Sequence, residues 1–135
     1  MLVSACAVAS NGDPYEVGEV VVAETELTVW IADESSERRQ GLRGVERLPD
    51  GVDGMLFVLP NATSTSFNMR GTLIPLDIWW FDADMTLIGR TEMEPCPASP
   101  CVSYGSPGAI GWALETPAGD RDFSRGDRLL IVEND

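Results

Sequence analysis

The pattern of apolar and polar positions is mostly that of β-strands. Leu27, Val29 and Ile31 alternate with polar neighbours, which predicts a strand with one buried face. Residues 54–59 form a continuous apolar run that ends at Pro60, and we expect a strand buried on both faces there. Further strand-like patterns occur at residues 20–22, 65–70, 76–81, 86–93, 110–115 and 128–132.

One helix interrupts these strands, over residues 33–40. Asp33 or Ser35 can serve as its N-cap, acidic side chains occupy the first turn, and Gly41 follows the last turn. Strands recur along the rest of the chain. This pattern predicts a mainly β fold: a compact β-sandwich or barrel-like domain with one short helix.

A β-hairpin is predicted where residues 82–85, Asp-Ala-Asp-Met, separate two strand patterns. The carboxylates of Asp82 and Asp84 have the close spacing that Ca²⁺ accepts, but the segment lacks the glycine and distal glutamate of an EF-hand loop. We therefore interpret it as a turn and predict no metal site.

The chain has four tryptophans, most of which are expected in the core. Trp79 and Trp80 are consecutive, so one indole points to each face of their strand. We expect one of them in the core, and the other either in a cross-sheet contact or exposed as a stacking platform for a sugar ring. Trp30 and Trp112 are expected in the core.

Length and charge narrow the possible functions. The 135 residues suit a single domain, and the net charge of −13 makes nucleic acid and anionic lipid poor partners. All nine basic residues are arginine, since the chain has neither Lys nor His. The lack of His removes the commonest general base and most zinc sites. We expect no cofactor.

The first residues suggest a membrane tether. Val3-Ser4-Ala5-Cys6 resembles a bacterial lipobox, and a small polar segment follows it. Residues 1–14 are thus interpreted as a disordered tether or the remnant of a lipoprotein signal, with lipidation at Cys6, and 15–135 as a single β domain. The alternative is a disordered N-terminus that contains Cys6 by chance. A membrane contact is expected only through such an anchor.

The other two cysteines, Cys96 and Cys101, lie in a short proline-rich segment. A disulfide between them would suit an oxidising, extracytoplasmic compartment, and two buried free thiols are the alternative. A structural zinc site needs four N/S ligands, and the chain has no His and only one other Cys.

Several motifs follow one another in a recognisable order. They are residues 37–42 (ERRQGL), 54–57 (GMLF), 67–72 (FNMRGT), 74–78 (IPLDI), 93–96 (MEPC), Tyr104, Leu114-Glu115 and Gly126-Asp127. Together they resemble the family called domain of unknown function 192, over roughly the last hundred residues. The resemblance implies a compact, mostly β fold with one short helix, often exported and sometimes lipid-anchored. It implies no established activity.

The chain departs from this family in the fourth strand. The family usually has an aromatic residue before Met69, Lys at position 70 and Asn at position 71, where this chain has Asn68, Arg70 and Gly71. Any role that requires a Lys nucleophile or an aromatic platform at these positions is therefore not expected here.

The polar residues of these motifs are the candidate ligand-binding residues, together with the tryptophan pair. They are Arg38, Arg70, Asp77, Trp79, Trp80, Glu94, Tyr104 and Glu115. One interpretation is a cleft in which carboxylates beside an arginine bind a polar ligand. The other is internal: Asp77 and Glu115 pair with Arg38 or Arg70 and hold the helix against the sheet.

Three functions remain open. The first is a non-enzymatic, extracytoplasmic binding module for a small polar or carbohydrate-like ligand or an envelope protein. The second is a small hydrolase or lyase that uses Asp77, Glu94 or Glu115 with Arg38 or Arg70. The third is a purely structural accessory module. We expect a binding module rather than an enzyme, and we assign no catalytic residue.

Overall fold

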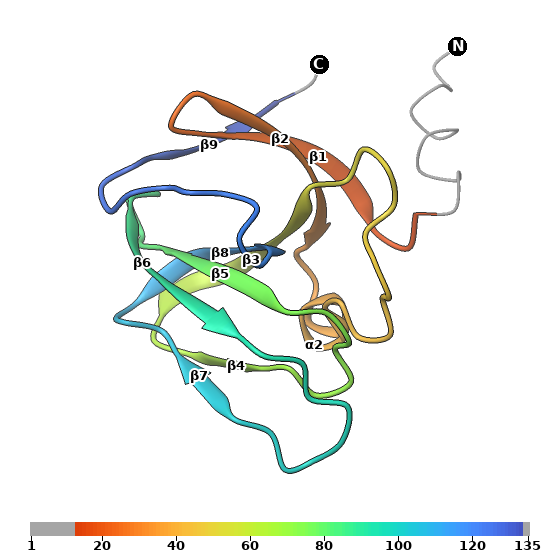
Figure 1. The fold of residues 1–135 in the computed structure, drawn as a ribbon. Helices are drawn as coiled ribbons and strands as arrows, with labels where there is room; N and C mark the ends of the chain where they lie inside the picture. The colour runs from red at the N-terminus through yellow and green to blue at the C-terminus, as the bar shows by residue number, and fades with distance from the viewer. Residues whose placement is uncertain (1–12, 134–135) are drawn as a thin grey trace.

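The computed structural model describes residues 13–133, which form nine strands and one helix (Figure 1). The mainly β fold with one short helix is confirmed. In chain order the elements are β1 (Glu16–Val22), β2 (Thr25–Ala32), α2 (Ser35–Gln40), β3 (Gly54–Thr63), β4 (Ser66–Asn68), β5 (Leu76–Phe81), β6 (Leu87–Met93), β7 (Ser103–Gly105), β8 (Ile110–Pro117) and β9 (Leu129–Val132).

Seven strands form one curled sheet in the order β6-β5-β8-β3-β2-β1-β9, and β4 pairs with β7 in a second sheet. All neighbours are antiparallel except β2 and β3, which are parallel and joined through α2. The sheet curls so that its two end strands, β6 and β9, approach each other. The backbone N–H of Leu129 on β9 donates to the carbonyl of Met85, just before β6, at 2.9 Å. The sheet is therefore barrel-like but only partly closed.

Side chains alternate between the two faces of the large sheet and form two apolar clusters. One, which we call the closed cluster, includes Val29, Leu56, Trp79, Phe81 and Leu114. The other includes Phe57, Met69, Ile78, Trp80 and Ala113, and we call it the pocket-side cluster because it borders the pocket described below. Figure 1 shows β1, β2 and β9 over one side of β3, β5 and β8, and α2 with β4 and β7 on the other side. The second group of elements covers the pocket-side cluster.

Helix α2 starts later than predicted, and its N-cap is Glu34 rather than Asp33 or Ser35. The backbone of Glu34 is extended, and the Glu37 carboxylate accepts the Glu34 N–H at 3.2 Å. This bond satisfies a backbone donor at the start of the helix, and the carboxylate also lies favourably in the first turn. The helix buries no residue of its own, so contacts outside it must hold it in place.

Several strands differ from the predicted ranges. Strand β1 begins earlier, at Glu16, and β4 covers only Ser66–Asn68. Strand β3 continues through Pro60 to Thr63, and its register with β8 shifts between Val58 and Thr63. A shift of register accommodates a proline, which has no N–H to donate to the ladder. Strand β7 was not predicted, because its three residues are too few to show alternation.

The predicted hairpin between β5 and β6 is present. A single oxygen of Asp82, Oδ1, accepts the N–H groups of Asp84 and Thr86 at 2.9 and 3.0 Å. This carboxylate closes the turn, as an Asp commonly does.

Candidate ligand-binding site

A pocket of about 340 Å³ lies beside helix α2, between the helix, the loop after it, β3 and β4. Its volume is near the lower end of the range for small-molecule sites, roughly 300–1,000 Å³. It combines apolar and polar walls. The lining residues are Ser35, Arg38, Arg39, Gln40, Gly41, Leu42, Arg43, Phe57, Leu59, Thr65, Ser66, Phe67, Asn68, Thr72 and Glu115.

The chain turns sharply after α2 and so forms one wall of this pocket. Gly41 has a φ of 51°, a conformation that favours glycine, and a Cβ there would come 3.5 Å from the Phe57 ring. The hydroxyl of Tyr15 donates to the Gly41 carbonyl at 2.8 Å. The next residue, Leu42, is buried in the pocket-side cluster. The turn therefore fixes the helix end close to the sheet.

Two phenylalanines form the apolar part of the wall. The ring centroids of Phe57 and Phe67 are 5.0 Å apart in an edge-to-face arrangement, and Phe67 makes a similar contact with Trp80. Edge-to-face aromatic pairs are favourable beyond the area they bury. The small β4–β7 sheet is thus attached to the large sheet by aromatic contacts at the pocket.

Glu115 is the one carboxylate among the lining residues. It lies on β8 in register with Met55 of β3 and Ile78 of β5, and its side chain is 4% exposed. No residue in the range 13–133 donates a hydrogen bond to its carboxylate or forms an ion pair with it. Because burial disfavours the charged form, the pKa of Glu115 rises from 4.5 to about 8. At pH 7 it is mostly a neutral carboxylic acid.

Three of the nine arginines line the pocket: Arg38, Arg39 and Arg43. Arg38 donates through Nη1 to the carbonyls of Asp33 and Val58 at 2.8 and 3.0 Å, which ties α2 to β3. Arg39 donates to the Ser35 hydroxyl. Within the described part of the chain, none of the three forms an ion pair with a carboxylate.

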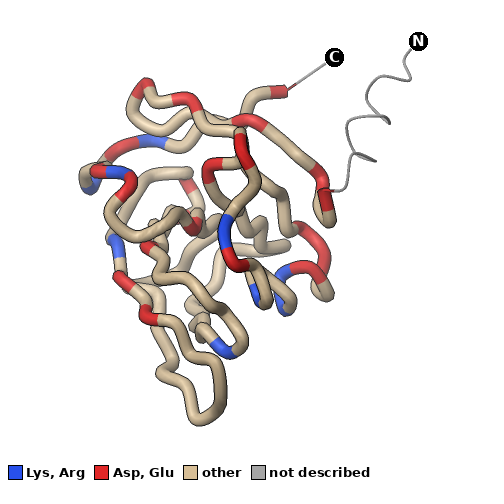
Figure 2. The backbone as a smooth tube through the Cα atoms, turned by 45° about the vertical axis from the view of Figure 1, so that its right-hand side comes forward, with Lys and Arg blue, Asp and Glu red and all other residues tan. Residues whose placement is uncertain are grey.

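This absence of ion pairs is notable in so acidic a protein. The chain has 22 acidic residues, and Figure 2 shows Asp and Glu over much of the described chain, although residues 54–76 and 95–114 contain none. The three arginines nevertheless gather where the lining carboxylate is mostly uncharged. The pocket is therefore cationic at neutral pH, although the protein as a whole is strongly anionic.

Asp77 lies outside the pocket, on the opposite face of the large sheet from Glu115. Its two carboxylate oxygens accept from Arg90 Nη1 at 2.9 Å and from the Gly119 N–H at 3.0 Å. The predicted internal pairing of Asp77 with Arg38 or Arg70 is wrong, because Arg90 on the neighbouring strand β6 occupies that place.

Both Trp79 and Trp80 are buried, with exposed fractions of 2% and 0%. Their indole N–H groups donate to the hydroxyls of Thr116 and Thr91, respectively, each at 3.0 Å. Neither ring is an exposed stacking platform. Trp30 is buried as predicted, whereas Trp112 is only partly buried.

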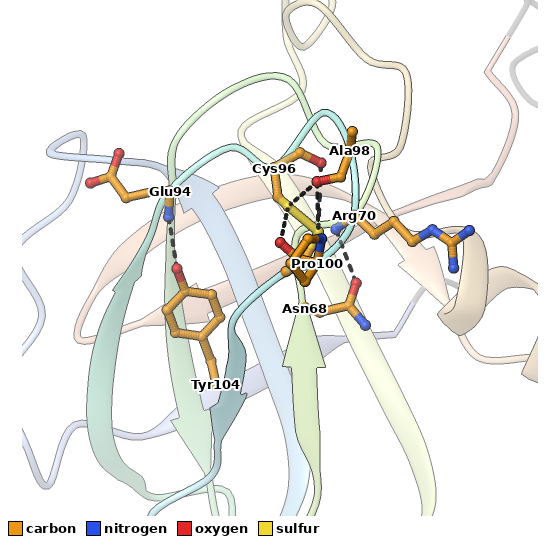
Figure 3. The surroundings of a disulfide bond; sticks show 8 residues. Asn68, Arg70, Glu94, Cys96, Ala98, Pro100 and Tyr104 are labelled. Atoms are coloured by element: carbon orange, nitrogen blue, oxygen red, sulfur yellow. Dashed lines mark hydrogen bonds between the residues drawn. A yellow bond between two sulfur atoms is a disulfide. The ribbon is translucent and has the colours of Figure 1, made fainter.

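Arg70, Glu94 and Tyr104 surround the disulfide rather than the pocket (Figure 3). Cys96 and Cys101 are joined, as the first of the two alternatives predicted. The Tyr104 hydroxyl accepts the Glu94 N–H at 3.2 Å, and the side chains of Glu94 and Arg70 point away from each other. These three residues form no common site with Glu115.

Of the predicted candidates, the pocket therefore includes only Arg38 and Glu115. Sequence analysis missed Arg39 and Arg43, which are four residues apart in an acidic chain. Spacing alone could not have found them, because Arg43 lies beyond the end of α2 at Gln40, and Arg47 continues the same spacing without lining the pocket.

The predicted lipidation site at Cys6 and residues 1–12 of the predicted tether lie outside the described residues. Asp13 is described, and its carboxylate accepts the Trp30 indole N–H at 3.0 Å, so the folded domain begins before residue 15. Among residues 13–133, no group of His, Cys, Asp and Glu is arranged to hold a metal ion. No helix in that range is long and apolar enough to cross a membrane.

Solved structures that are similar to this chain include two bacterial proteins. A proposed transcription regulator from Sinorhizobium meliloti 1021 has 28% sequence identity and a TM-score of 0.76, over 90% of this chain and 98% of that one. A protein of unknown function from Novosphingobium aromaticivorans DSM 12444 has 23% identity and a TM-score of 0.73, over 88% of each chain. The second likeness shows the fold alone. No curated protein matches the chain.

The family comparison agrees with the resemblance in the motifs. The model of the DUF192 family, described as "Uncharacterized ACR", matches residues 19–131. This range includes every strand from β2 to β8, the helix and the whole lining of the pocket. The chain therefore belongs to the DUF192 family.

Proposed function

We propose that this protein is a binding module for a small polar ligand, which it holds in the pocket beside α2. The observation that carries the proposal is Glu115, a buried carboxyl group without a protein partner that lines a cavity of ligand size. Its oxygens are not among the fully enclosed atoms without a partner, so a ligand in the pocket can reach the carboxyl group and form a hydrogen bond with it.

Binding is favoured over hydrolysis by paired carboxylates. Such hydrolysis requires two carboxyl groups on either side of one bond. Asp77 is on the other face of the sheet, and Glu94 is not among the residues that line the pocket. Glu115 has the raised pKa of a general acid, but no second carboxylate lines the pocket.

The location that we propose is extracytoplasmic, with a tether at Cys6. The Cys96–Cys101 disulfide supports an oxidising compartment. The description of the Sinorhizobium protein as a proposed regulator does not carry over readily, because a net charge of −13 opposes binding to DNA. An envelope protein remains the alternative partner.

A thermal-shift screen tests the binding proposal. The probes are glucose, N-acetylglucosamine, glucuronate and glucose 6-phosphate, each at equal ionic strength. A ligand at 100 times its dissociation constant stabilises the folded state by about 2.7 kcal/mol, and the melting temperature of a domain of this size should rise by several degrees.

A pair of variants places the effect in the pocket. Ser66 on β4 is exposed and lines the pocket, so Ser66→Trp should fill the cavity and abolish the shift. Val102, just before β7, is 63% exposed and is not among the lining residues, so Val102→Trp is the control. Equal shifts in both variants, or no shift with any probe in the wild type, would contradict the proposal.

A further inference from the structure

The charge of the pocket indicates the chemical class of its ligand. Arg38 and Arg39 use part of their donors on neighbouring oxygens, whereas the guanidinium of Arg43 has no hydrogen bond to any residue in the range 13–133. Each guanidinium carries five N–H donors, so most of these donors are free for a ligand. Guanidinium groups bind oxyanions by paired, charge-assisted hydrogen bonds.

Arg43 is also held in position for this role. A Cβ at position 71 would come 3.6 Å from Cγ of Arg43, so the aliphatic part of this side chain packs against Gly71. The Gly44 N–H donates to the Gly71 carbonyl at 2.9 Å, which joins the two loops. The side chain of Arg43 thus lies along a fixed surface, and less of its conformational entropy remains to be lost on binding.

The remaining walls suit a hydroxylated ring. Phe57, Phe67 and Leu42 present apolar surface, and the hydroxyl and amide groups of Ser66, Asn68 and Thr72 lie among them. A sugar ring has apolar C–H faces and hydroxyl groups on its rim, so it needs both kinds of wall. The neutral carboxyl of Glu115 can donate one hydrogen bond to a hydroxyl and accept another.

We propose, on the basis of the binding function above, that the ligand is a small oxyanion with the size of a monosaccharide, a sugar carboxylate or a sugar phosphate. Its charged group lies among Arg38, Arg39 and Arg43, and its hydroxyl groups lie toward Glu115. The protonated carboxyl of Glu115 carries no negative charge, so it does not repel an anionic ligand that binds to the arginines.

This arrangement makes affinity depend on pH. The charged or titratable groups that line the pocket are Arg38 and Arg39 on α2, Arg43 in the loop after it, and Glu115 on β8. Strands β3 and β4 contribute none. A guanidinium group in a protein does not lose its proton in the working range of pH. When pH rises through about 8, Glu115 loses its proton and repels the anion. Affinity should therefore fall by about tenfold between pH 6.5 and 9.5.

Nuclear magnetic resonance titration can detect such binding even when it is weak. Glucuronate, glucose 6-phosphate and neutral glucose are added at constant ionic strength, and the Nε–H signals of the arginines are followed. We expect glucuronate or glucose 6-phosphate to shift the signals of Arg38, Arg39 and Arg43, and glucose to bind at least tenfold more weakly. The stronger of the two anions identifies carboxylate or phosphate as the preferred group.

Three variants localise the effect. Arg43→Gln should weaken binding of the anion about tenfold, while Arg47→Gln, an exposed arginine of the same loop outside the pocket lining, should leave it unchanged. Glu115→Gln should retain binding at pH 6.5 and lose the pH dependence. Glucuronate is the probe for the pH series, because its carboxylate stays ionised throughout it.

The outcomes separate this inference from the proposed function. If glucose binds as tightly as the two anions and Ser66→Trp abolishes that binding, the module binds ligands but the oxyanion inference is wrong. If Arg43→Gln and Arg47→Gln weaken the anion equally, the effect is general charge screening and the inference is also wrong. If no probe perturbs the pocket signals, both proposals fail.

Discussion

Two buried carboxyl groups on neighbouring strands, Asp77 and Glu115, have opposite environments. Asp77 on β5 accepts hydrogen bonds from Arg90 and from the Gly119 N–H on the face of the closed cluster. Glu115 on β8 faces the pocket and receives no bond from any described residue. Both residues are nearly inaccessible to water, at 1% and 4% exposure.

The residues adjacent to them extend the contrast. Thr116 follows Glu115 directly but faces the closed cluster, where its hydroxyl accepts the Trp79 indole N–H at 3.0 Å. The guanidinium of Arg90 lies 5.8 Å from the centre of the Trp79 ring. Polar groups on this face therefore stabilise one another, whereas Glu115 on the pocket face has no partner among the described residues. Burial alone does not distinguish a structural carboxylate from a binding one; its partners do.

Replacement of Asp77 should have the largest effect on stability. Asp77→Ala removes a charge-assisted hydrogen bond from Arg90, whose side chain is 48% exposed, and leaves the Gly119 N–H unpaired, so we expect a loss of about 4 kcal/mol in the free energy of unfolding. Asp77→Asn keeps the shape and one acceptor and should lose less. Urea denaturation measures both. If Asp77→Ala is as stable as the wild type, Asp77 is not a structural residue and the contrast with Glu115 disappears.

Glu115→Gln should act in the opposite direction and stabilise the protein by about 3 kcal/mol at pH 7. Below pH 4.5 the carboxyl is protonated in both states, and between pH 4.5 and about 8 only the unfolded chain releases the proton. The folded state then binds more protons, so stability falls by about 1.4 kcal/mol for each pH unit and levels off above pH 8. Gln has no proton to release, so the Glu115→Gln variant does not lose stability over this pH range.

Urea denaturation at pH 5.5, 7 and 8.5 checks this expectation. The stability difference between Glu115→Gln and the wild type should grow with pH, because the variant lacks the titrating group. A constant difference across the three pH values would show that Glu115 has an ordinary pKa, and the pocket would then not contain a neutral carboxyl group.

Replacement of Thr116 should have the smallest of the three effects. Thr116→Val keeps the shape of the side chain but leaves the Trp79 indole N–H without its acceptor, at a cost of about 1.5 kcal/mol. Thr116→Ser, which retains a hydroxyl, is the control. The pH dependence of stability should match that of the wild type in both variants, since Glu115 faces the other way. A changed pH dependence would mean that the two faces are coupled.

Much of the secondary structure could be predicted from the sequence, because apolar alternation reports directly which positions are buried. It identified the hairpin of β5 and β6, the helix after residue 33 and the final strand. The N-cap of α2 could not be found in this way, since it depends on the extended backbone of Glu34 and the reach of Glu37. The parallel pairing of β2 with β3 was equally inaccessible, because alternation says nothing of neighbours in a sheet.

The site was harder to predict, but one part of it was within reach. The register of the β5–β6 hairpin places Asp77 opposite Glu92 and therefore diagonal to Arg90, a distance that long side chains span. That inference would have found the right partner for Asp77. The pocket itself joins Arg38, Phe67 and Glu115, which only the folded chain brings together.

The pairing of β1 with β9 bears on how the chain reaches its folded state. Val20 lies opposite Ile131 and Val22 opposite Leu129, so β1, near the start of the described residues, pairs with a strand near their end. Contacts between such distant parts of a chain require the closure of a long loop, which slows folding. During synthesis, before β9 has left the ribosome, the backbone groups on one edge of β1 have no strand to pair with. Only the arrival of β9 covers that edge and removes a surface prone to aggregation.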